Sequence, residues 1–397
     1  MSDLYNSILV NSILKNYQDG NKKIAFKKLE KYIKKYPKDK TAVYNFAYMA
    51  QLLGHTDLAI INYKKSNKLD EKNWRSRFNL YIIFIKQKKY NLALKLVNSV
   101  LNIIPNYQPA LRDKALIYFQ INKPDLALPI IIKSISLNPK DYIAINTLGL
   151  IYGSLKLHSK AKETFEKAIQ INPEYATSYN NLGNTLQILN HYNLALTNFK
   201  KAYEINPDFE ESINNIANIY SITGKYKKSI KYYEIALNKG GVNPTIYYNI
   251  GVAYFYLNQI DKAEYFYKKS YKINSNDEKL KKNYSLLLLA KQKYKKAWKF
   301  FDGRLHLDEF VSKNSSISNI RNKLWKDSSI SSKDKILVIK EQGIGDEILY
   351  GSMYPDLLKV YPKCKIETET RLLPVFKRSF GDNNNFIPFS FYSKQKK

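Results

Sequence analysis

The chain has 397 residues, with 65 lysines and arginines against 34 aspartates and glutamates, so its formal charge is +31 at pH 7. This length exceeds one ordinary hydrophobic core, and we expect either several domains or an array of repeats. The basic residues are spread along the chain and form no basic run beside a nucleic-acid-binding motif, so we expect no nucleic-acid ligand.

The N-terminal residues, MSDLYNSILVNSILKNYQDG, lack the basic start and the unbroken apolar stretch of a secretory signal peptide. No run approaches the roughly 18 apolar residues that a membrane-spanning helix needs. The single cysteine, Cys364, has no partner for an internal disulfide. We therefore expect a cytoplasmic protein without a membrane span.

Small residues recur at intervals of 34 through most of the chain, which predicts an array of repeats. If these residues are numbered as position 20 of each unit, position 8 is also small except at Tyr81, position 24 is large, and position 32 is often proline. The position-20 series is Ala25, Ala59, Ala93, Ala127, Ala161, Ala195, Ser229, Ala263 and Ala297.

This spacing is typical of a helical hairpin. Two helices approach to about 8–10 Å only where small residues meet, and positions 8 and 20 supply them. The large residue at position 24 is expected to fill the gap to the next unit. Proline at position 32 cannot continue a helix, so it separates one hairpin from the next.

The pattern resembles the tetratricopeptide repeat over residues 6–305, with nine units of which the first is degenerate. The resemblance implies a mostly α-helical fold, a right-handed solenoid of helix-turn-helix units. Each repeat of such a solenoid contacts only its neighbours, and the first helices line a concave face. Tetratricopeptide domains are protein-binding scaffolds, so a protein or peptide partner is expected on that face.

Position 6, on the first helix of each unit, is rich in asparagine: Asn45, Asn79, Asp113, Thr147, Asn181, Asn215, Asn249 and Asn283. An asparagine amide offers one acceptor oxygen and two donor hydrogens, which matches a peptide unit of an extended chain. Helices about 10 Å apart would place one amide near every third residue of such a chain, because a strand rises about 3.3 Å per residue. The series resembles the asparagine ladder in the repeats of the O-linked N-acetylglucosamine transferases, which implies peptide binding.

The alternative is that these asparagines cap or bridge neighbouring helices. Two further asparagines, Asn184 and Asn218 at position 9, would widen the polar track if the ladder is correct.

Beyond residue 305 the repeat stops, and a polar connection over 306–334 is followed by a different pattern. We predict a strand over 335–340, a helix over 346–361, a second strand over 365–369 and a second helix over 371–380. This β-α-β-α order is the start of a doubly wound α/β domain, a short and partial Rossmann-like segment.

The turn EQGIGD, residues 341–346, follows the first predicted strand. It lacks the third glycine of a dinucleotide fingerprint and the Gly-Lys-Ser/Thr of a P-loop. The carboxylates of Asp346 and Glu347 would also repel a phosphate at the helix start. Asp346 is then either a general base for a hydroxyl or a helix N-cap.

The segment from YKKAWKFFDGRL through LW to KILVIKEQGIGDEILYGSMYPDLL resembles repeat proteins that carry a heptosyltransferase-like glycosyltransferase domain of the GT-B fold. The resemblance implies that Asp346 is the catalytic base and that Gly343 and Gly345 shape the acceptor loop. A GT-B enzyme needs a second lobe for its nucleotide sugar, and residues 335–397 are too few for even one lobe.

We therefore expect a protein-binding scaffold whose C-terminal segment is an incomplete and inactive glycosyltransferase-like domain. The alternative is a glycosyltransferase, acting on proteins or heptosyltransferase-like, that obtains its nucleotide-sugar lobe elsewhere. The four histidines show no ligand spacing, and we assign no metal and no cofactor.

Overall fold

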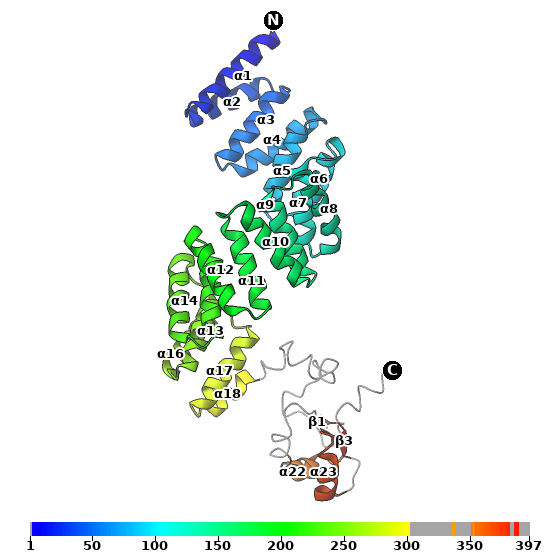
Figure 1. Cartoon of the computed structure of the whole chain (residues 1–397), viewed down its shortest axis with the longest axis vertical. Coiled ribbons are helices and arrows are strands. Elements are labelled where there is room, and N and C mark those ends of the chain that lie inside the picture. Colours follow the sequence, from blue (N-terminus) through cyan, green and yellow to red (C-terminus); the bar gives the residue numbers. More distant parts are fainter. Residues whose placement is uncertain (1, 302–335, 339–350, 352, 382–384, 389–397) are drawn as a thin grey trace. The chain divides into compact units, whose positions relative to one another are not determined.

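The computed structural model describes residues 2–301, 336–338, 351, 353–381 and 385–388, and the side chains of residues 2–8 and 301 are excluded from the description (Figure 1). The chain divides into two units, residues 1–239 and 240–397, and each is described by itself. Among the described residues, no helix is long and apolar enough to cross a membrane.

Eighteen helices form nine consecutive hairpins, as the 34-residue period predicts. The first helices of the hairpins are α1 (Ser2–Gln18), α3 (Lys40–Leu52), α5 (Trp74–Lys86), α7 (Gln108–Gln120), α9 (Tyr142–Ser154), α11 (Ala176–Ile188), α13 (Glu210–Ile222), α15 (Pro244–Tyr256) and α17 (Glu278–Ala290). The second helices are α2 (Lys22–Lys35), α4 (Thr56–Leu69), α6 (Tyr90–Ile103), α8 (Pro124–Leu137), α10 (His158–Ile171), α12 (Tyr192–Ile205), α14 (Tyr226–Gly240), α16 (Ile260–Ile273) and α18 (Tyr294–Phe301). Within each unit, successive hairpins pack in chain order (Figure 1).

The crossing inside each hairpin depends on a small residue at position 8. A Cβ added to Gly149 would lie 2.5 Å from the Phe165 ring, and one added to Gly183 would lie 2.6 Å from the Phe199 ring. Position 24 therefore packs onto position 8 of its own hairpin. In addition, Phe165 shares a buried cluster with Leu182 of the next hairpin, as predicted.

The prolines at position 32 stand just beyond the second helices. Helix α2 ends at its C-cap Tyr36, whose backbone N–H donates to the Tyr32 carbonyl at 2.8 Å, and Pro37 follows. Because proline has no N–H, it cannot extend this pattern, and the chain turns toward α3.

The turn inside each hairpin carries a left-handed residue at position 15, a feature that the sequence analysis missed. These residues have φ between 56° and 94°: Gly20, Gly54, Lys88, Asn122, Lys156, Asn190, Gly224, Asn258 and Gln292. Glycine and asparagine adopt this conformation at low cost, whereas lysine and glutamine are strained there.

The C-terminal segment contains β1 (Leu337–Val338), α22 (Tyr354–Val360), β2 (Lys365–Thr368), α23 (Leu373–Phe380) and β3 (Phe386–Pro388). The strands form a parallel sheet in the order β1-β2-β3. Rings of Tyr354, Phe376 and Phe386 pack together beside the buried Ile366. The four predicted elements correspond in type and order to β1, α22, β2 and α23, whereas β3 was not predicted. The linker 306–334 and the turn with Gly343, Gly345 and Asp346 lie outside the described residues.

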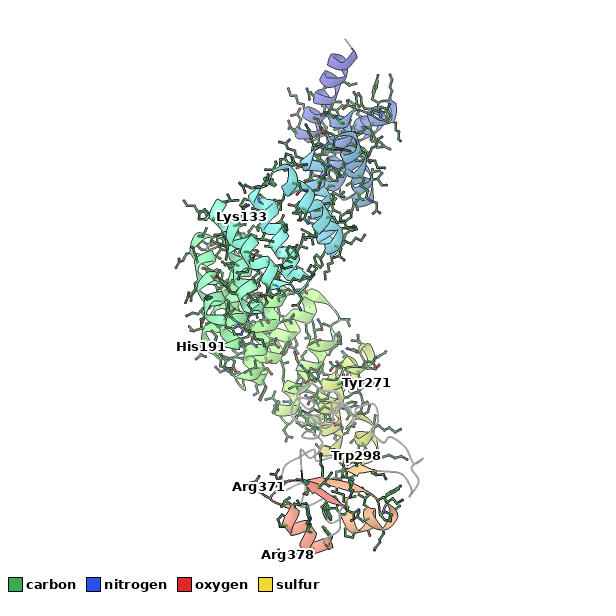
Figure 2. The ribbon with its side chains drawn as sticks, turned by 90° about the vertical axis from the view of Figure 1, so that its right-hand side faces the viewer. Lys133, His191, Tyr271, Trp298, Arg371 and Arg378 are labelled. Atoms are coloured by element: carbon green, nitrogen blue, oxygen red, sulfur yellow. The ribbon has the colours of Figure 1, made fainter. Side chains whose placement is uncertain are left out.

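Basic side chains are distributed over the hairpins. Lys133 on α8, for example, is exposed (Figure 2). The positive charge of the repeats is therefore mostly a property of solvated helix faces, as the sequence indicates.

Candidate peptide-binding site

The position-6 asparagines lie on the first helices and are half-buried, neither in the core nor fully in solvent. In each helix they lie two residues before position 8, which is small in every case except Tyr81 after Asn79. The hydrogen-bond partner of each amide therefore decides what the series can do.

Four of these amides bridge to the preceding repeat. In each case the Nδ2 group donates to the side chain 35 residues earlier, at position 5: Asn79 to the Tyr44 hydroxyl (3.3 Å), Asn181 to Asn146 Oδ1 (3.1 Å), Asn215 to Asn180 Oδ1 (3.0 Å) and Asn283 to the Tyr248 hydroxyl (2.7 Å). The geometry thus contains the helix-bridging role that the sequence left open as an alternative.

The bridges form a denser network in the central repeats. Asn215 Nδ2 also donates to Oδ1 of the exposed Asn184, at 3.0 Å. Asn146 additionally accepts from the Ser178 hydroxyl at 3.1 Å, and both Asn146 and Asn180 are nearly inaccessible to solvent. This network holds the amides of Asn181 and Asn215 in one orientation.

The orientation leaves the oxygen side of these amides available. Among the described residues, Oδ1 of Asn181 and Oδ1 of Asn215 accept no hydrogen bond, while their Nδ2 groups are engaged. The asparagine pattern predicts both a donor and an acceptor role for each amide. In the structure Asn215 uses both of its N–H donors within the protein and can offer only an acceptor, whereas Asn181 uses one N–H and can still offer an acceptor and a second donor.

The remaining predicted residues differ from this arrangement. Asn45 Nδ2 donates to the Thr41 carbonyl of its own helix at 3.0 Å. Asn218 accepts from the hydroxyl of the buried Tyr233, so it anchors the ring at position 24. Asn249 also has an interaction partner.

The series is interrupted in the fourth and fifth repeats. The Asp113 carboxylate is buried, accepts from the Tyr81 hydroxyl at 3.1 Å and pairs with Arg112 at 3.0 Å. Burial raises the pKa of Asp113, although the neighbouring Arg112 opposes this change. Thr147 bonds to the Ile143 carbonyl of its own helix at 2.8 Å. The asparagines before and after this interruption therefore belong to separate stretches of the series.

The position-5 residues were not identified from the sequence. They belong to several residue types, among them Tyr44, Asn146, Asn180 and Tyr248, so no single residue recurs. Burial raises the pKa of the Tyr248 hydroxyl to about 12, which keeps it protonated while it accepts from Asn283. An offset of 35 residues, one repeat plus one residue, is the signal that would have found these pairs.

The family comparisons agree with the hairpin architecture. Residues 141–208, 210–238 and 244–277 each match a family model described as a tetratricopeptide repeat. These segments are therefore tetratricopeptide repeats. The matched segments end at residue 277, before the C-terminal segment.

Solved structures show the same fold. A tetratricopeptide repeat protein from Parabacteroides merdae is 16% identical with a TM-score of 0.54, and the match covers 62% of this chain and 98% of that chain. A chain of the APC/C hetero-tetramer Cut9-Hcn1 is 16% identical with a TM-score of 0.53, over 76% of this chain and 58% of that chain. No protein of curated function was found to match this sequence. At these identities the likeness concerns the fold alone.

Proposed function

We propose that the repeats are a scaffold that binds an extended segment of a partner protein along the first helices, with the asparagine amides contacting its backbone. The observation that carries the proposal is the orientation of Asn181 and Asn215, whose Nδ2 groups are fixed by Asn146 and Asn180 while Oδ1 of each has no partner among the described residues. An acceptor held in place by the protein binds without first losing its own conformational freedom.

The ligand group that fits these oxygens is a backbone N–H. Each extended residue carries one such donor, and every donor must find an acceptor when water is displaced. First helices about 10 Å apart would then contact roughly every third residue of the bound chain. Contacts of this kind grip a chain with little regard to its side chains, so the scaffold would accept several sequences.

The test must separate peptide binding from helix bridging, because the same amides do both. The double variant Asn181→Ala, Asn215→Ala removes the bridges and the free oxygens, whereas Asn146→Ala, Asn180→Ala removes only the bridging acceptors. We measure by calorimetry the affinity for a peptide selected from a random 12-residue library. It should fall by about thirtyfold more in the first variant, since two hydrogen bonds are lost and each is worth about 1 kcal/mol. Thermal unfolding measures the stability loss that the two variants share. Equal affinities in both variants would reject the backbone contact.

For the C-terminal segment, we propose that residues 335–397 correspond to the N-terminal part of a GT-B glycosyltransferase-like domain, joined to the repeats of residues 6–305 by the linker 306–334. The parallel order β1-β2-β3, with α22 and α23 between the strands, favours this assignment. A transferase activity, with Asp346 as base and Gly343 and Gly345 in the acceptor loop, is the alternative function. Calorimetry of the full chain with nucleotide sugars tests it: binding would support the transferase, and no binding would favour the scaffold alone.

A further inference from the structure

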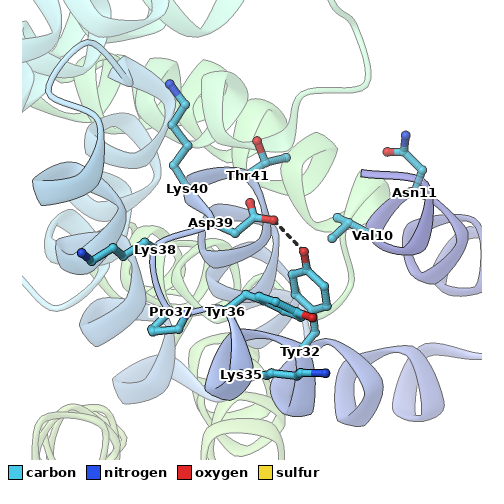
Figure 3. Close-up of a pocket in the computed structure, with 10 residues that line it drawn as sticks. All are labelled: Val10, Asn11, Tyr32, Lys35, Tyr36, Pro37, Lys38, Asp39, Lys40 and Thr41. Carbon is cyan, nitrogen blue, oxygen red and sulfur yellow. Dashed lines mark hydrogen bonds between the residues drawn. The ribbon is translucent and has the colours of Figure 1, made fainter. Parts of the chain in front are cut away.

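The N-terminal hairpins carry two neighbouring cavities that the asparagine series does not explain. The first has a volume of about 760 Å³ and lies between α1, the end of α2 and the start of α3 (Figure 3). The second, of about 320 Å³, lies between α3 and the start of α5. Both are lined by Lys40 and Thr41, so they flank one helix start. The larger volume falls within the range of about 300–1,000 Å³ that is usual for ligand sites.

The two cavities are strongly basic. Their linings contain Lys35, Lys38, Lys40, Lys72 and Arg75 but only two carboxylates, Asp39 and Asp70. Among the described residues, no carboxylate lies within 4.0 Å of the charged groups of Lys35, Lys38, Lys72 or Arg75, while Lys40 pairs with Asp70 at 3.3 Å. These four cations therefore have no carboxylate partner among the described residues.

The two carboxylates are fully engaged inside the protein. Asp39 caps α3 by accepting from the Ala42 N–H at 2.9 Å, and its other oxygen accepts from the Tyr32 hydroxyl at 3.0 Å (Figure 3). Asp70 accepts from the Lys72 N–H at 3.1 Å with one oxygen and pairs with Lys40 through the other. Both carboxylates therefore have partners within the fold, and five cations against two carboxylates leave the combined linings with a net formal charge of +3.

The aromatic side chains of the cavities argue against a nucleic acid. Stacking of a base requires an open ring face. Trp74 has Arg75 over its ring at 5.0 Å and Tyr107 beside it at 4.7 Å. Tyr36 likewise has Lys35 over its ring at 5.3 Å and Tyr32 at 4.8 Å. These rings are packed against the protein's own side chains, so the cavities offer apolar edges and cations and no stacking platform.

The second cavity is continuous with the asparagine series. Its lining includes Tyr44, whose hydroxyl accepts from Asn79, and Tyr44 directly precedes Asn45. A chain that lies along these amides would bring its side chains to Lys72 and Arg75. In this respect the inference rests on the proposed function.

We propose that the N-terminal repeats bind an acidic, extended segment of a partner protein, with its carboxylates at Lys35, Lys38, Lys72 and Arg75 and its apolar side chains in the two cavities. Opposite charges across such a surface raise the rate of encounter and select the partner. The central repeats then grip backbone, and the N-terminal repeats select for negative charge.

The test uses the full chain and two fluorescein-labelled 12-residue peptides, one alternating Glu and Leu and the other with Gln in place of Glu. Fluorescence anisotropy at 0.15 M salt should give the Glu peptide an affinity about tenfold higher than the Gln peptide, since two desolvated charge contacts are worth about 1.5 kcal/mol or more. The double variant Lys72→Glu, Arg75→Glu should lose this advantage. If that variant unfolds, Lys72→Gln, Arg75→Gln replaces it.

A matched control separates a site from general attraction. The double variant Lys133→Glu, Lys167→Glu changes the net charge equally at two exposed lysines on second helices. It should alter the affinity for the Glu peptide by less than about threefold, because charges beyond about 8 Å are screened at this salt concentration. Equal losses in the two double variants would overturn the proposal, as would tighter binding of a 12-residue uridine oligonucleotide than of the Glu peptide.

The outcome also distinguishes the two proposals. One outcome is that the Gln peptide binds the unmodified chain with the same affinity as the Glu peptide and binds the Asn181→Ala, Asn215→Ala variant more weakly. In that case the scaffold proposal stands and the acidic site is refuted. If the Glu peptide depends on Lys72 and Arg75 while neither peptide responds to the asparagine variant, then the acidic site stands and the backbone contact is refuted.

Discussion

Replacing Gly149 by alanine tests the packing that builds each hairpin. The new Cβ would lie 2.5, 2.7 and 2.8 Å from Cε1, Cζ and Cδ1 of Phe165, which is closer than carbon atoms approach. Overpacking of this kind costs about 1–3 kcal/mol, whereas the helix propensity of alanine over glycine returns about 1 kcal/mol.

Gly153 on the same helix provides the control, because a Cβ there meets nothing within 4 Å. Both substitutions gain helix propensity, so the difference between them isolates the clash. We expect Gly149→Ala to be less stable than Gly153→Ala by about 1–3 kcal/mol in urea unfolding followed by far-UV circular dichroism.

A double variant identifies the ring as the cause. The fourth repeat pairs Ala115 with Ile131 at the same two positions, so Phe165→Ile should relieve the clash. The combined variant Gly149→Ala, Phe165→Ile should then be more stable than the sum of its parts by about 1–2 kcal/mol. Equal stabilities of Gly149→Ala and Gly153→Ala, or strict additivity in the double variant, would refute the reasoning.

Three other predictions concern the turns and the buried charges. Lys156 has φ 61°, so Lys156→Gly should raise stability by about 1 kcal/mol, and Gly224→Ala, at φ 72°, should lower it by a similar amount in the same unfolding assay. Arg112 contacts the carboxylates of the buried Asp113 and the half-buried Asp141 at 3.0 and 3.2 Å, so Arg112→Met should lower the free energy of unfolding by about 3 kcal/mol. Adding Asp113→Asn should recover part of this loss, and no recovery would contradict the charge argument. Burial tends to raise the pKa of Glu264, but hydrogen bonds from Lys268 and Lys291 lower this pKa to about 2. The ionised carboxylate should therefore stabilise the fold fully above about pH 5, and this contribution should be lost as the pH falls toward 2. In a pH series of melting temperatures, Glu264→Gln should flatten this acidic part of the curve.

The architecture of the repeats was predictable because the crossing of two helices restricts residue size at fixed positions. Position 8 must be small where position 24 is an aromatic ring, and Gly149 with Phe165 shows the restriction directly. Tyr81, the exception at position 8, stands in the repeat that has only Val97 at position 24. The helix ends at position 32 were also predictable, because proline cannot continue a helix.

The bonding of the candidate site was less predictable because it depends on contacts between repeats. Asn79 and Asn283 donate to tyrosines, whereas Asn181 and Asn215 donate to asparagines. The acceptors therefore lie at the same repeat position but share no residue type. The left-handed turn at position 15 was missed for a similar reason: backbone conformation is common to the nine turns, but Lys88 and the other residues there differ in type. The role of Asp346 stays a prediction.

The central claim is that asparagine oxygens of the scaffold accept hydrogen bonds from the backbone of a bound chain. Replacing single amides of the selected 12-residue peptide by esters removes one backbone N–H at a time and leaves the side chains unchanged. We predict affinity losses of up to about tenfold that recur at roughly every third residue, and that disappear at one site in Asn181→Ala. Ester peptides that all bind as tightly as the parent, or losses that persist unchanged in Asn181→Ala, would contradict the account.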